Sequence, residues 1–407
     1  MYFFIAAILA LTLIYGLFGI RVIRPARVNP RLKALLWALL SICYLALPIA
    51  VFFRFNTPDS PVSIPLSWFA YVSFGFFTLT FAAILLRDSL FFIFKSITTS
   101  IKQLSALRFS SALPPSFTRV KNLAPKDSSK RLFLVNTTNL ALLGATGSLT
   151  GYGVGHARQI PRVVDIQVVL DSLPPEFEGF KILQLTDIHV SMTIRRDYVK
   201  AVVDKANDQN ADMIVLTGDL ADGHVKDLRS ETAPLAALKA GFGKFFVTGN
   251  HEYYSGVESW LAEINALGFT SLLNENRMIH RNGAQISLSG VTDYRAGQIV
   301  PLHASSPKAA LASVPENLTK IMLAHQPKSI FQAEAAGADL LITGHTHGGQ
   351  YIPWNYLVPL DQPYVKGLHT HGHTQIYVSR GTGYWGPPLR IGAPSEITVF
   401  TLVQKKA

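Results

Sequence analysis

The sequence predicts a helical transmembrane region of three to four spans, followed by an α/β domain with a largely parallel or mixed β-sheet covered by helices. Three observations support this prediction. Long apolar stretches without charged residues occur in the first 160 residues. Beyond them, short β-branched runs alternate with helical patterns, which is typical of α/β domains. Polar residues directly follow several of these runs, so a site is expected at one edge of the sheet.

The composition limits the class of protein. The chain has 407 residues, enough for more than one domain, of which 49% are hydrophobic and 15% charged; its mean hydropathy is +0.26. This balance excludes a disordered chain and is too apolar for an ordinary soluble enzyme. Cys43 is the one cysteine, which excludes an internal disulfide, a thiolate metal cluster and a CxxC redox pair.

Three apolar stretches, each of about 20 residues, are long enough to cross a bilayer: Tyr2–Ile20, Ala34–Phe53 and Ile64–Leu86. The first is not a cleavable signal peptide, because no basic segment precedes it and further spans follow. A fourth stretch, Leu132–Gly155, is interrupted by glycines and small polar residues, and the sequence leaves open whether it spans or forms a linker. We expect a membrane region over residues 1–156 and a second domain over 161–407.

The charges are distributed unevenly. The net charge is +11, yet residues 1–160 hold 16 Lys and Arg against 3 Asp and Glu, so the second half is slightly acidic. A nucleic-acid partner is therefore not expected. The basic residues cluster at 21–33 and in a loop predicted at 87–131, and the positive-inside rule places both on the cytoplasmic face of an inner or plasma membrane. Four spans then put the second domain outside the cytoplasm, and three put it inside.

The segment Ser129–Leu134 resembles a twin-arginine export signal. It departs from that pattern at Lys130 and Val135, and the alternative is a basic stop before a membrane span.

The second half contains buried-strand runs separated by amphipathic helical patterns. Helices are expected near residues 195–207, 257–267 and 328–336. The predicted strands are Lys181–Thr186, Asp212–Thr217, Lys244–Thr248, Lys320–Ala324, Leu340–Thr343, Gln375–Ser379 and Glu396–Leu402.

Chemically active side chains follow five of these strands. They are Asp187, His189, Asp219, Asn250, His251, His325, His345 and His347. Ligands of open α/β sheets bind at the carboxyl ends of strands, so these side chains are expected to converge. Buried carboxylates and imidazoles at one edge are costly without a cation, which predicts a metal centre.

The motifs that carry these residues resemble those of the calcineurin-like metallophosphoesterase superfamily. They are TDIH at 186–189, GD at 218–219, GNHEYYSG at 249–256, His325, TGHTHGGQ at 343–350 and the closing YVSRGTGYWGPPLR. Within the superfamily, the chain is similar to the membrane-anchored or exported bacterial branch typified by YkuE and YaeI. The resemblance covers about residues 181–402 and implies a sandwich of mixed β-sheets flanked by helices.

The resemblance also implies the metal ligands. One metal would be held by Asp187, His189 and His347, a second by Asn250, His325 and His345, and Asp219 would bridge them. An aspartate suits this position because its two oxygens can bind two cations about 3.5–4 Å apart. If residues 345–347 are extended, both histidines point to one face. Mixed imidazole, carboxylate and amide donors suit manganese, iron or zinc.

His251 has a separate role in the resemblance. It would contact the substrate, where it stabilises charge or protonates the leaving oxygen. Glu252, Tyr253 and Tyr254 are expected to orient the same loop or to line the groove. Three further histidines, His369, His371 and His373, are expected to form a turn around Gly372 rather than a third metal site.

These predictions combine into a membrane-anchored metal-dependent phosphoric ester hydrolase of phosphodiesterase type. A hydroxide bridging two divalent metals would attack a phosphodiester or pyrophosphate, and an envelope or lipid-linked substrate would suit the membrane spans. One alternative is a cytoplasm-facing nucleotide phosphodiesterase. Another is a non-catalytic membrane sensor on the same fold, which the complete set of ligands disfavours.

Overall fold

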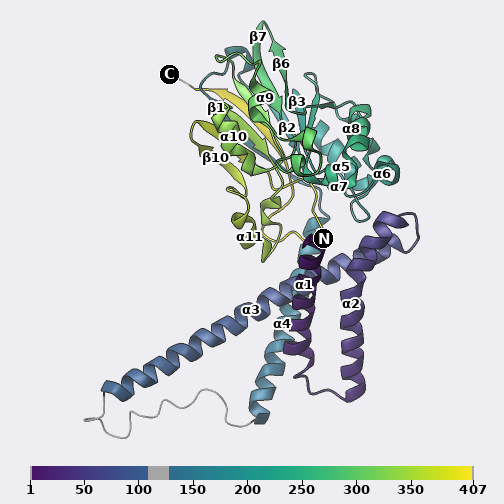
Figure 1. Cartoon of the computed structure of the whole chain (residues 1–407), viewed down its shortest axis with the longest axis vertical. Coiled ribbons are helices and arrows are strands. Elements are labelled where there is room, and N and C mark those ends of the chain that lie inside the picture. The colour runs from purple at the N-terminus through teal and green to yellow at the C-terminus, as the bar shows by residue number, and fades with distance from the viewer. Residues whose placement is uncertain (1, 109–127, 406–407) are drawn as a thin grey trace. The chain divides into compact units, whose positions relative to one another are not determined.

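The computed structural model describes residues 2–108 and 128–405, which form two compact units (Figure 1). The first comprises Met1–Leu47 and Ser73–Gly151, and the second comprises Pro48–Val72 and Tyr152–Ala407. The basic residues Arg119, Lys121 and Lys126 of the predicted cytoplasmic loop lie outside the described residues.

Long apolar helices make up the N-terminal part of the chain. They are α1 (Tyr2–Phe18), continued by the π-helix η1 (Gly19–Ile23), α2 (Pro30–Asn56), α3 (Ser63–Arg108) and α4 (Ser128–Ala157). Four of their stretches are long and apolar enough to cross a membrane: 5–23, 30–56, 63–101 and 132–157. The fourth stretch, uncertain from the sequence, is therefore helical over a length that can span.

Two polar residues of α4 have partners on other helices of the first unit. Asn139 accepts a hydrogen bond from the Arg87 guanidinium at 2.5 Å and donates one to the carbonyl of Arg21 at 2.9 Å. The Thr80 hydroxyl donates to that of Thr146 at 3.0 Å. Interhelical hydrogen bonds of this kind stabilise contacts between membrane helices. Asn139 and Thr146 therefore make contacts between helices.

Helix α3 is longer than the sequence analysis predicted. The predicted span ends at Leu86 and a loop was expected from residue 87, but the helix continues to Arg108. Residues 87–108 contain neither proline nor glycine, the residues that most strongly end helices. Charged residues such as Arg87 and Asp88 end an apolar span without ending a helix. The prediction took the end of the apolar span for the end of the helix.

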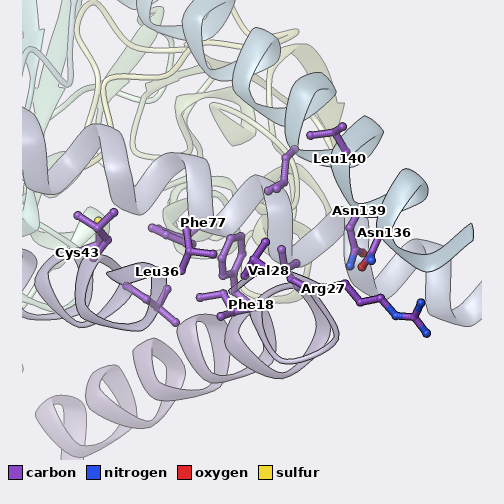
Figure 2. A pocket seen from close by; sticks show the side chains of 15 residues that line it. Phe18, Arg27, Val28, Leu36, Cys43, Phe77, Asn136, Asn139 and Leu140 are labelled. Carbon is purple, nitrogen blue, oxygen red and sulfur yellow. The ribbon is translucent and has the colours of Figure 1, made fainter. Parts of the chain in front are cut away.

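The first unit also contains a crevice of about 490 Å³ between its helices (Figure 2). Most of its lining is apolar and includes Phe18, Leu36, Phe77 and Leu140. Figure 2 shows the Arg27 guanidinium directed away from these side chains. The crevice is thus an apolar space between packed helices.

The second unit contains two six-stranded mixed sheets (Figure 1). The first has the order β1 (Arg162–Leu170), β12 (Glu396–Gln404), β2 (Lys181–Leu185), β3 (Met213–Thr217), β4 (Lys244–Val247) and β5 (Thr270–Ser271). The second has the order β10 (Gly367–His371), β11 (Thr374–Val378), β9 (Leu340–Thr343), β8 (Lys320–Leu323), β7 (Ala284–Gly290) and β6 (Glu275–Arg281). The predicted sandwich of mixed sheets is confirmed.

Alternate residues of the strands face different layers. On β2, Ile182 belongs to the core between the two sheets, whereas Leu183 and Leu185 pack against helices on the outer face. Those helices are α5 (Arg196–Asn207), α6 (Val225–Thr232), α7 (Asn250–Ser255) and α8 (Val257–Ala266) (Figure 1). The outer face of the second sheet is covered by α9 (Pro307–Leu311) and α10 (Ile330–Ala335).

The strands that lead to the predicted site run in parallel within each sheet. β2 pairs with β3 and β3 with β4 in the first sheet, and β8 pairs with β9 in the second. The buried amide of Gln184 links the two sheets below the site, since it donates to the Thr217 hydroxyl at 2.7 Å and to the Thr343 carbonyl at 3.0 Å. Five strand ends are thereby held at one edge of the sandwich.

Candidate metal centre

The predicted site residues converge at this edge. Asp187 and His189 follow β2, and Asp219 follows β3. The others lie at the start of α7 after β4 (Asn250 and His251), after β8 (His325) and after β9 (His345 and His347). All are buried except His251 and His345, which are half-buried.

Asp187, His189 and His347 form one group of potential ligands. One donor atom from each lies within 4.8 Å of the other two. The Nε2 atoms of the two histidines are 3.1 Å apart, and His347 Nε2 is 3.6 Å from Asp187 Oδ1. Metal bonds of about 2.1 Å hold neighbouring ligand atoms at about this separation, so these side chains fit a single divalent cation.

Asp219, His325 and His345 form a second group of the same kind. His325 Nε2 lies 3.1 Å from Asp219 Oδ2 and 3.1 Å from His345 Nδ1. Beside them, the buried Oδ1 of Asn250 has no hydrogen-bond partner among the described residues. Buried acceptors are nearly always satisfied, so this orphaned oxygen fits a cation ligand.

Asp219 connects the two groups. Its Oδ2 is 3.1 Å from His325 Nε2 in the second group and 3.8 Å from His189 Nε2 in the first. Its Oδ1 accepts the backbone N–H of His251 at 2.9 Å. The carboxylate therefore lies between the two groups.

The backbone is left-handed at five of the predicted ligands. Asp187, His189, Asp219, His345 and His347 have φ between 51° and 70°. A positive φ is unfavourable for residues with a side chain, and such outliers concentrate at functional sites. The expectation that residues 345–347 are extended is wrong: Thr346 has φ −79° between two left-handed residues. The two imidazoles converge because the chain turns tightly.

The pKa shifts of the site residues show that its buried carboxylates favour nearby positive charge. Burial raises the pKa of Asp187, whereas His325 and His251 outweigh burial at Asp219 and hold its pKa well below the usual value. His325 in turn has a pKa well above normal, because Asp219 outweighs its burial. Burial and the charge of His325 lower the pKa of His345 to about 3. A divalent cation would supply the charge that protons otherwise provide.

Asp222 is a site residue that the sequence analysis missed. Its Oδ1 lies 3.1 Å from His189 Nδ1 and 2.5 Å from His251 Nδ1, so one carboxylate oxygen orients both rings. With Nδ1 engaged, His189 presents Nε2 to the first group of ligands. The contact with Asp222 and the charge of Asp219 outweigh burial and raise the pKa of His251 to about 9. Only the three-residue spacing from Asp219 hinted at this role.

Glu252 holds the loops of the site together. Its buried carboxylate accepts backbone N–H groups of Gly249 at 2.7 Å, Leu220 at 2.8 Å and Asp219 at 3.0 Å. Burial and the nearby Asp219 raise its pKa to about 7 despite these hydrogen bonds. At Gly249, an added Cβ would collide with the Asp219 carboxylate, so this close approach requires glycine. These contacts agree with the orienting role expected of Glu252.

Arg390 is a second residue without a predicted role, although it ends the closing motif. Its buried guanidinium donates to the carbonyls of His347 at 2.9 Å, Arg380 at 2.8 Å and Gly383. It also donates to His347 Nδ1 at 3.0 Å, which places the proton of the neutral ring on Nε2. To bind a cation through Nε2, His347 must carry its proton on Nδ1 instead. Arg390 would then lose its contact with Nδ1 but keep its hydrogen bonds to the carbonyls.

The comparisons with known proteins agree with this geometry. Residues 180–349 match the sequence model of the calcineurin-like phosphoesterase family. An uncharacterized metallophosphoesterase of Helicobacter pylori is 42% identical over 268 residues, which cover 65% of this chain and 69% of that protein. The chain belongs to the calcineurin-like phosphoesterase family.

Two other relatives of this calcineurin-like phosphoesterase illustrate its range. A transmembrane protein with a metallophosphoesterase domain from Danio rerio is 38% identical over 275 residues, covering 66% of this chain and 63% of that protein. The Bacillus subtilis metallophosphoesterase YkuE is 33% identical over 293 residues, covering 68% of this chain and 98% of that protein. The predicted family is confirmed, and the chain is a metal-dependent phosphoester hydrolase.

The three histidines of the C-terminal hairpin have separate partners in this phosphoesterase. His369 contacts the Lys366 carbonyl, His371 contacts the Tyr364 hydroxyl, and His373 lies 3.3 Å from Glu334. Gly372 forms the tip between β10 and β11 with φ 57°. The expected turn is present, and the three rings do not form a common group of ligands in the described structure.

The contacts of Glu252 generate a prediction about metal binding. Glu252→Gln replaces one acceptor oxygen with a donor that faces backbone N–H groups, so the loops carrying Asp219 and Asn250 should separate. We expect the affinity for Mn²⁺ to fall about 10- to 100-fold, the usual range for groups that support metal ligands. Metal titration of the full-length protein in detergent measures this change. Glu258→Gln, on an exposed side chain of α8, is the matched control; equal affinities in all three proteins would contradict the prediction.

Proposed function

We propose that the protein is a membrane-anchored phosphoesterase with two divalent metals, which hydrolyses phosphodiester or pyrophosphate bonds. The observation that carries this proposal is the pair of ligand groups joined by Asp219. Asp187, His189 and His347 would hold one cation. Asn250, His325 and His345 would hold the other.

The donor set fits manganese, iron or zinc, because imidazole nitrogens dominate and carboxylate and amide oxygens complete it. When bound, two such cations supply Lewis-acid chemistry: they neutralise phosphoryl charge and lower the pKa of water. Asp219 would contribute its carboxylate to both cations. Asp222 and Glu252 would hold the ligands in place, since both are buried and accept hydrogen bonds from the loops and rings of the site.

In this proposal His251 would act on the substrate. Its Nδ1 contacts the Asp222 carboxylate, which fixes the orientation of the ring. The ring lies beside two exposed aromatic side chains, with centroids 5.4 Å from Tyr254 and 5.7 Å from Trp385. This position at the rim suits a group that donates a hydrogen bond or a proton to the leaving oxygen.

The membrane helices favour a substrate at the bilayer. A lipid-linked or envelope phosphoester would present its phosphate near the membrane surface, and the exposed Tyr254 and Trp385 offer apolar contact area beside His251.

The basic segment at residues 21–33 would face the cytoplasm, and four crossings would place the catalytic domain outside it. A cytoplasm-facing nucleotide phosphodiesterase remains the competing function. The complete ligand set argues against a non-catalytic sensor.

Asp219→Ala tests the metal mechanism. Loss of the carboxylate between the two ligand groups should reduce hydrolysis of a generic phosphodiester at least about 100-fold, because both cations lose a ligand. The assay uses full-length protein in detergent with Mn²⁺, with a phosphomonoester in parallel to define the ester class. Chelator should abolish activity in the wild type. Activity that survives both chelator and the substitution would overturn the two-metal proposal.

His251→Ala tests the substrate-facing role. We expect turnover to fall about 100- to 1,000-fold, the usual contribution of a positioned proton donor, while two Mn²⁺ ions stay bound. Steady-state kinetics and metal analysis of the same preparation give the two readouts. His369→Ala removes an exposed histidine of the hairpin and should leave both unchanged. Loss of metal from the His251 variant would make it a ligand instead.

A reporter fused after Ala407 tests the side of the membrane. If residues 132–157 cross the bilayer, alkaline phosphatase at this position should be active and a cytoplasm-only reporter inactive. Inactive alkaline phosphatase with an active cytoplasm-only reporter would contradict an extracytoplasmic catalytic domain and favour the nucleotide phosphodiesterase. A fusion after Thr57, between α2 and α3, should report the same side as the C-terminus.

A further inference from the structure

The segment between the second and third candidate spans belongs to the same compact unit as the catalytic domain. That unit includes Pro48–Val72, which covers the end of α2 and the start of α3. Arg54 Nη2 lies 3.7 Å from Asp222 Oδ1. The ring of Phe55 packs edge-on against His224 with centroids 5.9 Å apart, and Arg158 lies 5.6 Å over the Trp68 ring. The loop after β3 is therefore in contact with the end of α2.

The ion pair between Arg54 and Asp222 is buried. Only 14% of the arginine side chain and 5% of the aspartate side chain are exposed. Removing two charges from water is costly, and such a pair is weak evidence for a gain in stability alone. Losing one partner of a buried pair is strongly unfavourable, because the other charge is left uncompensated. The arginine therefore constrains where the Asp222 carboxylate can lie.

A single carboxylate oxygen serves all three partners. Asp222 Oδ1 faces Arg54, His189 Nδ1 and His251 Nδ1. His189 belongs to the first group of potential metal ligands, and His251 stands at the rim of the site. A shift of Asp222 would change the orientation of both rings.

We propose that Arg54 of the second membrane helix is a positioning residue of the phosphoesterase site, acting through Asp222 on His251 and His189. This inference rests on the proposed function, because it concerns the rate of that reaction. Arg54 touches neither substrate nor metal in this proposal. Its guanidinium holds the carboxylate that orients the two histidines, so the membrane region completes the catalytic site as well as anchoring it.

The contact has a consequence for topology. Arg54 lies at the end of α2, and two candidate spans, α3 and α4, separate it from the catalytic domain. If α3 crosses the membrane, the catalytic domain returns to the side of Arg54 only when α4 crosses too. The three-span arrangement would separate Arg54 and Asp222 by a bilayer.

The kinetic test uses the full-length protein in lipid nanodiscs with Mn²⁺ and a generic phosphodiester. We expect Arg54→Gln to lower kcat about tenfold, at the lower end of the range for groups that support metal ligands, with KM within about twofold. Arg54→Lys keeps the charge and should recover most of this loss. The double variant with Asp222→Asn should be no slower than Asp222→Asn alone, because residues acting through one contact are not additive.

The matched control is Arg21→Gln, which removes a different ion pair of the membrane helices, with Asp88 at 3.0 Å. It should keep wild-type kcat. An equal loss in this variant, a wild-type kcat in Arg54→Gln, or losses that multiply in the double variant would each overturn the inference. Wild-type protein without metal-dependent hydrolysis would instead refute the proposed function, so the two failures are distinguishable.

A cross-linking test remains informative if Arg54→Gln does not fold. In a Cys43→Ser background, Phe55→Cys and His224→Cys should be joined by a bifunctional methanethiosulfonate cross-linker, because the native rings are in contact and neither residue is in the proposed site. A gel shift that reducing agent reverses reports the bond. Failure of this pair to cross-link in folded, active protein would show that α2 does not reach the loop after β3.

Discussion

The Asp219 carboxylate is a buried negative charge shared between two clusters of imidazoles, and the architecture of the catalytic domain follows from the need to compensate it. A carboxylate in this position is stable only with positive partners and hydrogen-bond donors on every side. His325 and His189 come from different sheets of the sandwich, and the N–H of His251 comes from the start of α7. The two sheets must therefore meet at one edge. Gln184 links them below the site, where both its contacts are buried.

The left-handed residues show what this convergence costs. Asp187, His189, Asp219, His345 and His347 each hold an unfavourable backbone conformation, at about 1 kcal/mol or more apiece. The strands before them are buried, apart from Lys181 at the start of β2, and paired on both sides, which fixes where each chain leaves the sheet. Tight turns where each chain leaves the sheet bring the Asp and His side chains back over the strand ends. The paired strands hold these strained turns in place.

The sequence predicted which side chains converge at the sheet edge, because each one follows a buried strand and a strand end fixes its position. It failed where the contact joins distant segments. Asp222 lies on a loop with no motif of its own, and Arg390 reaches His347 from 43 positions away. The turn at residues 345–347 was misjudged because period-2 reasoning holds only for extended chain, whereas both histidines are left-handed. β1 was missed for another reason: its alternating exposed and half-buried residues lack the continuous apolar run that marked the central strands.

The boundary between the apolar helices and the catalytic domain does not fall at the end of the last helix. Pro48–Val72 shares a compact unit with the catalytic domain, although it is more than 80 residues away in sequence. A lone arginine at the end of an apolar helix would ordinarily reach for water or head groups. The Arg54 side chain instead points toward the buried carboxylate of Asp222. An anchor alone requires no such contact, since apolar length is sufficient to hold a helix in the bilayer. The arginine is explained when the helix end also holds the loop that carries Asp219 and Asp222.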